Sequence, residues 1–167
     1  MFDLGKALLD GAIFSLIGSL YLVVMLWYNP RIAMNKGDYP DDVIAAAPPK
    51  TQKEKRLGII FGVPFLVYIV VYPIFSTLTL NKSGSGETPF LDLFLHLIVL
   101  IFFFNLVDLL ILDLWMFCTI TPKFVVIPGT EGFPGYKDKG MHIRAHAKAS
   151  VGMVLIALLG AWIISII

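Results

Sequence analysis

Four long apolar runs, separated by polar connections, dominate the pattern of hydrophobic positions along the chain. A helix of about 20 apolar residues crosses a hydrocarbon core about 30 Å thick, and each run comes close to or exceeds that length. None of the runs shows the strict alternation typical of barrel strands. The pattern predicts an all-α integral membrane protein, with four transmembrane helices in an antiparallel bundle at about residues 8–28, 57–80, 90–117 and 148–167.

The connections between these runs are short, and no internal repeat is evident. Residues 29–56 and 122–148, the longest connections, are too short to form domains of their own. We therefore expect residues 1–167 to form a single four-helix transmembrane domain. Because a chain of this size leaves limited room for a lumen between its own helices, transport would require an oligomer.

Composition excludes several classes of protein. Hydrophobic residues make up 57% of the chain and charged residues 15%, which excludes an ordinary soluble domain. The net charge is +1, so no broad basic surface for nucleic acid is expected. Cys118 is the single cysteine, which excludes an intrachain disulfide and a Cys-based zinc or iron–sulfur site. We expect Cys118 to be a small packing residue.

Positive charge predicts the orientation, because Lys and Arg are retained on the cytoplasmic side of a membrane. The two long connections hold eleven of the thirteen: Arg31, Lys36, Lys50, Lys53, Lys55, Arg56, Lys123, Lys137, Lys139, Arg144 and Lys148. We expect both termini outside and both connections in the cytoplasm, in the inner membrane of a bacterium. The expected partners are membrane lipids, together with further copies of the chain or a larger membrane complex.

Small residues recur every four positions in the first run, at Gly11, Ser15 and Ser19. This spacing lets helix backbones approach closely in lipid. Ala157 and Ala161 repeat the pattern weakly in the fourth run. Packing inside one bundle is favoured over a contact between two copies.

Ionisable residues in the third run are the main functional candidates, because a charge at membrane depth needs a partner or water. At 100° per residue, Asn105, Asp108, Trp115 and Thr119 share one face, whereas Asp113 projects to a different side. We expect an inner polar site made by Asn105, Asp108, Asp113, Thr119, Lys123, Glu131, Arg144 and Lys148.

The inner site has two interpretations. The favoured one is an ion pair of Asp108 or Asp113 with Arg144 or Lys148. The alternative is a divalent metal site, in which His142 and His146, spaced i and i+4, join acidic ligands. The candidate acids are Asp108, Asp113, Glu131 and Asp138. The zinc-protease motif HExxH is incomplete, because Ile143 replaces its glutamate.

A glycine-rich connection with lysines, residues 121–140, favours either a turn-rich surface loop or a pocket for a phosphate or lipid head group. It matches no nucleotide-binding motif. Haem is not expected either, because His96 lies near the outer surface and the other two histidines lie near the inner one.

A second polar set lies near the outer surface. Asp92 and His96 share a helical face, and Asp10 lies at a comparable depth on the first run. The set predicts either a proton relay or a structural hydrogen bond.

The sequence thus predicts a multi-pass membrane protein whose cytoplasmic-side site binds a lipid head group, an anion or a metal ion, with catalysis undecided. One alternative is a small oligomeric transporter or channel coupled to protons or ions. Another is a non-catalytic subunit of a larger complex.

Overall fold

The computed structural model describes residues 2–83 and 88–166, and within these ranges the chain is helical without a strand. Four of the described helices are long and apolar enough to cross a membrane, which confirms the all-α class and the expectation of four such helices. The connection between the second and third spans lies partly outside the described residues. The long elements are α1 (Leu4–Tyr28), α4 (Gln52–Ser83), α5 (Phe90–Val107), its continuation η1 (Asp108–Ile120), and α6 (Lys139–Ser165).

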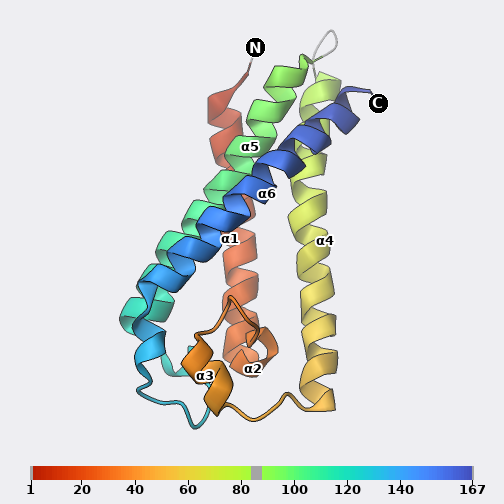
Figure 1. Ribbon diagram of the computed structural model, residues 1–167. Coiled ribbons are helices and arrows are strands. Elements are labelled where there is room, and N and C mark those ends of the chain that lie inside the picture. Colours follow the sequence, from red (N-terminus) through yellow and green to blue (C-terminus); the bar gives the residue numbers. More distant parts are fainter. Residues whose placement is uncertain (1, 84–87, 167) are drawn as a thin grey trace.

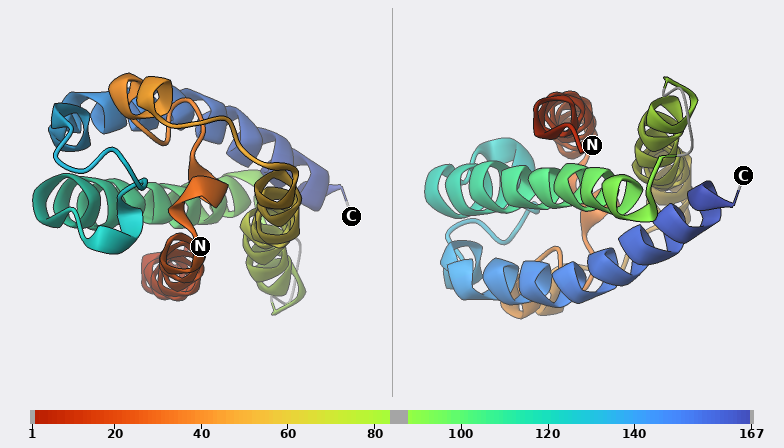
Figure 2. Two further views of the ribbon diagram at one scale, coloured as in Figure 1. Left: turned by 90° about the horizontal axis from the view of Figure 1, so that it is seen from below. Right: turned by 90° about the horizontal axis from the view of Figure 1, so that it is seen from above.

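Both termini lie at one end of the long helices, here called the terminal end, and the two long connections lie at the other, the connection end (Figure 1). Viewed along the helices, α5 and η1 stand between α1 and α6, and α4 stands to one side (Figure 2). The most extensive helix contacts are those of α5 with α1 and with α6. The third span, made of α5 and η1, therefore forms the centre of the bundle.

Helix α1 approaches α5 closely through its small residues. A Cβ atom at Gly11 would lie 3.0 Å from Cβ of Phe103, and one at Gly18 would lie 2.7 Å from the Phe104 ring. Ser15 is buried on the same face, and its hydroxyl donates to the Gly11 carbonyl at 2.7 Å. Gly11 and Ser15 of the predicted pattern thus pack inside the chain together with Gly18, whereas Ser19 is half-buried.

Helix α6 begins before the predicted boundary at residue 148. The Asp138 carboxylate accepts a hydrogen bond from the Met141 amide at 3.1 Å and caps the helix at Lys139. The additional turns carry exposed charged residues. These residues lower the local hydropathy, so the hydropathy pattern did not include the turns in the predicted span. The turns also bring His142 and His146 onto the same rigid helix as the membrane span.

The lower half of the third span is wound as a π-helix, η1, from Asp108 to Ile120. Its i to i+5 pattern is visible at the end, where the Thr121 amide donates to the Met116 carbonyl at 2.8 Å. In such a helix, residues five apart lie near the same face. The expectation that Asp113 projects away from Asp108 is therefore wrong, because it assumed α-helical winding.

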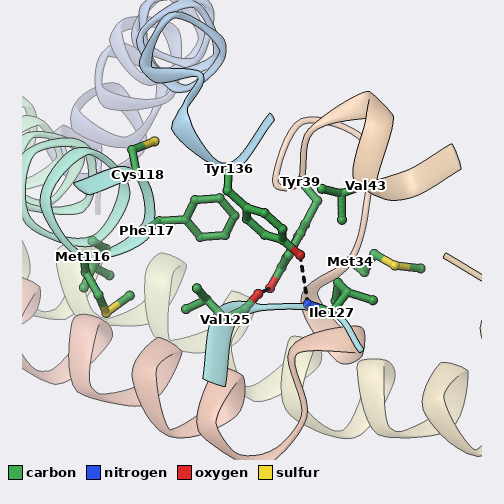
Figure 3. Packing of buried hydrophobic residues seen from close by; sticks show 10 residues of the cluster. Met34, Tyr39, Val43, Met116, Phe117, Cys118, Val125, Ile127 and Tyr136 are labelled. Carbon is green, nitrogen blue, oxygen red and sulfur yellow. Dashed lines mark hydrogen bonds between the residues drawn. The ribbon is translucent and has the colours of Figure 1, made fainter. Parts of the chain in front are cut away.

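The two long connections fold against each other and form a small core at the connection end (Figure 3). The Tyr39 hydroxyl donates to the Val125 carbonyl at 2.8 Å, and the Tyr136 hydroxyl accepts from the Ile127 amide at 2.9 Å. Cys118 is buried in this core as a free thiol, as expected of a packing residue. The short helices of these connections are α2 (Pro30–Ala33), α3 (Asp41–Ala46), η2 (Lys123–Val125) and η3 (Pro134–Lys137).

Candidate functional site

Two histidines of α6 meet one carboxylate of η1 near the connection end. Asp113 Oδ2 lies 2.9 Å from His142 Nδ1 and 2.9 Å from His146 Nε2. Asp108 Oδ2 lies 3.9 Å from the same His146 nitrogen. On the other side of that ring, His146 Nδ1 lies 2.7 Å from Asn105 Oδ1. These five residues are called the inner cluster below.

Proton accounting constrains the charge of His146. Its two ring nitrogens both face oxygen atoms, the Asn105 amide oxygen and the Asp113 carboxylate. When Asp113 is ionised, both oxygens are acceptors, so both nitrogens must carry protons and the ring is an imidazolium. The cluster thus contains its own internal ion pair, which reduces the cost of holding Asp113 at membrane depth.

His142 has one unused ring nitrogen. Its Nδ1 faces the Asp113 carboxylate, and its Nε2 lies on the other edge of the ring. This Nε2 is buried and has no hydrogen-bond partner within residues 2–83 and 88–166. A buried polar atom without a partner is costly, so it points to a group that the cluster binds.

The inner cluster lines a cavity of about 550 Å³ formed within one chain. This volume falls in the range of small-molecule sites. The cavity is a pocket within one chain, and the expectation that a transport lumen would require an oligomer stays a prediction. Most of the wall is apolar and includes Leu22, Met25, Leu26, Phe65, Leu66, Phe104 and Met153.

Two glycines of α4 contribute to this space. Gly58 and Gly62 line the cavity, and nothing lies within 4 Å of the position that a Cβ would take at Gly62. The wall at α4 is thus open where a larger residue would fill it. Hydropathy could not show this, because glycine in a membrane span has several uses.

The charged side chains in the cavity wall itself are acidic, apart from the imidazoles. The wall includes Asp38, Asp108 and Asp113 together with His142 and His146, and no Lys or Arg of the described residues lines it. Asp38 comes from the first long connection, so the sequence pattern did not include it in the site. Asp38 and Asp113 are far apart in the sequence, so no local spacing pattern could predict that they line the same cavity.

Asp38 lines the cavity from the first long connection, and its side chain is partly exposed. Loss of bulk water raises the pKa of Asp38 above its ordinary value, and the charge of Asp113 acts in the same direction. The Asn35 amide, 3.3 Å away, the Lys50 ammonium and His142 oppose this rise of the pKa. Asp38 is thus the acid of the cavity wall that lies outside the spanning helices.

The remaining residues predicted for the inner site lie elsewhere. Lys123, Arg144 and Lys148 are exposed, and Arg144 lies 3.7 Å from Asp138. The structure places histidines, not Arg144 or Lys148, against Asp113. The Thr119 hydroxyl donates to the Leu114 carbonyl at 2.6 Å, within η1.

Two backbone amides of the glycine-rich connection donate to carboxylates of the protein. The Glu131 carboxylate accepts from the Gly129 amide at 3.0 Å, and the Asp42 carboxylate accepts from the Gly135 amide at 3.0 Å. These amides would be the donors of a phosphate pocket, but the protein's own carboxylates occupy them.

No group of three or more His, Cys, Asp or Glu in the described part of the chain has an arrangement suited to a metal ion. The two histidines share a single oxygen of Asp113 at hydrogen-bonding distance, as in a proton-linked cluster. Of the four candidate acids, Asp138 caps α6 and Glu131 caps a turn, so these two carboxylates are used away from the histidines.

No protein family model, curated protein or solved structure matches the chain. Its function is therefore argued from the geometry of the sites alone.

The outer candidates lie at the terminal end. Asp10 Oδ2 is 3.5 Å from His96 Nε2, and Ser76 of α4 lies between them. Asp92 stands one turn before His96, in the first turn of α5. Ser76 is absent from the sequence prediction, because nothing in a run of apolar residues shows which serine faces a partner helix.

Proposed function

We propose that this membrane protein binds an amphiphile whose polar end donates hydrogen bonds or carries positive charge. The observation that carries the proposal is the lining of the cavity, where carboxylates and imidazoles meet an otherwise apolar wall without a Lys or Arg of the described residues. Among the ligands predicted from the sequence, this favours a lipid-like head group and disfavours an anion.

The polar end of the ligand has defined partners. Asp108 is an acceptor at the cavity wall, and the unpartnered Nε2 of His142 is a second acceptor. A hydroxyl or an ammonium group supplies the missing donors, whereas a phosphate would add negative charge beside Asp108. The apolar wall accepts an alkyl or isoprenoid chain, as is usual for pockets with a few placed polar groups.

Native mass spectrometry tests the proposal on protein extracted in mild detergent from the membrane in which it is made. We expect a bound amphiphile with an amine or hydroxyl head group. The Gly62→Leu variant should lose it, because the new side chain fills the cavity without touching the inner cluster. The proposal would be contradicted if the wild-type protein carried a phosphate lipid or a metal ion instead, and if Gly62→Leu lost it.

Binding should depend on pH through Asp38. An alkylamine remains protonated up to a pH of about 10. Ionised Asp38 attracts it, so affinity should increase as pH rises through the raised pKa of Asp38. The folded chain holds this proton more tightly than the unfolded chain, so folding stability should fall over the same range. Titration of octadecylamine into protein in nanodiscs should show the step in wild type and lose it in Asp38→Asn.

We also propose the orientation with both termini outside, because eleven of thirteen Lys and Arg lie in the two connections. A cysteine introduced at exposed Lys53 or Lys139 should react with an impermeant maleimide only after the membrane is opened. The natural cysteine, Cys118, is buried, so it should add little background labelling. If either cysteine were labelled in intact cells, the two connections would lie outside and the proposed orientation would be wrong.

A further inference from the structure

The cluster at the terminal end connects the surface of the bundle with a buried histidine. Lys6 Nζ lies 2.6 Å from Asp10 Oδ2, and the exposed fractions of these side chains are 36% and 14%. Ser76 Oγ lies 2.5 Å from the same carboxylate oxygen and 2.8 Å from His96 Nε2. His96 has no exposed surface, and its Nδ1 is buried without a partner in the described residues.

The order of these groups is carboxylate, hydroxyl, imidazole. In a nucleophilic triad the acid would hold the other nitrogen of the histidine, but here Asp10 holds the hydroxyl of Ser76. A hydroxyl between an acid and a base can donate to one while accepting from the other. This arrangement suits transfer of a proton and not acyl transfer.

We propose that Asp10, Ser76 and His96 form a proton relay between the surface at the terminal end and the interior of the bundle. In the loaded state, protonated Asp10 donates to Ser76 Oγ, and Ser76 donates to the unprotonated Nε2 of His96. The Asp10 proton passes to Ser76 as the Ser76 proton passes to Nε2. The products are the Asp10 carboxylate and the His96 imidazolium, and net charge is conserved.

His96 is the inner end of the relay, because its Nδ1 is buried without a partner in the described residues. The imidazolium carries a proton on both ring nitrogens, and the Nε2 proton returns to Ser76 Oγ as Ser76 returns its own proton to the Asp10 carboxylate. The other titratable groups near the relay are Asp3 and Lys6 at the start of α1 and Asp92, one turn before His96 on α5. Tyr72 of α4 is also close, and its hydroxyl donates to the Asp10 carbonyl at 3.3 Å. The part of α6 that packs on α5 is apolar, with Ala157, Ala161 and Ile164 buried.

The relay is separate from the cavity. His96 and Asn105 lie on one helix with nine residues of rise between them, or about 14 Å. Loss of the relay would therefore leave binding in the cavity intact.

Exchange of the His96 ring protons with water tests the relay. In protein labelled with ¹⁵N-histidine, NMR measures this exchange, and His96→Gln assigns the signal. We expect Ser76→Ala to slow the exchange by about a hundredfold, which is a typical contribution of one proton-transfer group. Ser76→Thr keeps a hydroxyl and should retain the wild-type rate.

Asp10→Asn is the second variant, because an amide cannot release and recover a proton in this range of pH; it should slow the exchange to the same extent. A purely structural hydroxyl would lower the melting temperature in Ser76→Ala and leave the exchange rate of His96 unchanged. An unchanged or faster rate in folded Ser76→Ala or Asp10→Asn would overturn the relay.

Discussion

Replacing Asp113 with alanine should lower the stability of the protein more than any other single change in the inner cluster. The carboxylate contacts His142 and His146 through one oxygen. Its removal leaves the His146 cation without its nearest partner, and breaking a buried charged pair costs about 3 kcal/mol. For a chain of this size the melting temperature should fall by about 10 °C. Thermal denaturation in detergent measures the change.

Two variants calibrate this result. Asp108→Asn should cost less, because Asp108 lies 3.9 Å from His146 and makes no closer contact with it. Glu131→Gln changes an exposed acid outside the cluster and should leave the melting temperature unchanged. If Asp113→Ala melts like Glu131→Gln, the histidines do not depend on Asp113.

Gly11→Leu should separate α1 from α5. A Cβ at this position already lies 3.0 Å from Cβ of Phe103 and 3.5 Å from Cα of Leu100. These atoms cannot move without their backbone, so a leucine forces the helices apart at a cost of about 3 kcal/mol. Lower thermal stability and faster proteolysis should both report the change.

Gly152→Leu is the matched control. This glycine lies in α6, and nothing lies within 4 Å of the Cβ that a substitution would add. The variant adds the same side chain to another spanning helix without a clash. Equal losses of stability in the two variants would show that leucine itself, and not the contact with α5, is responsible.

The spans could be predicted from sequence because long apolar runs leave few alternatives in a membrane. The start of α6 could not, because its first turns carry Lys139, Arg144 and Lys148 on exposed surfaces. Hydropathy measures the fit to lipid, whereas helix formation is set by the Asp138 cap and by packing. The apolar run therefore begins at about residue 148, whereas helix α6 begins at Lys139.

The inner cluster was only partly predictable. The i, i+4 spacing correctly placed His142 and His146 together, but the π-helical winding of η1 decides that Asp113 meets them beside Asp108. No pattern of residues in the sequence predicts this π-helical winding. Asp38 and Ser76 reach their sites through tertiary packing of other segments, which local spacing cannot show.

Photo-crosslinking tests the central proposal most directly. Three probes share one diazirine-bearing alkyl chain and differ only in an amine, hydroxyl or phosphate head group. The amine and hydroxyl probes should label the cavity wall around Leu66 and Met153, and Gly62→Leu should abolish this labelling. Asp108→Asn should weaken labelling by the amine probe about tenfold, while Glu131→Gln should not. Equal labelling by the phosphate probe, or unchanged labelling in Gly62→Leu, would contradict the proposed function.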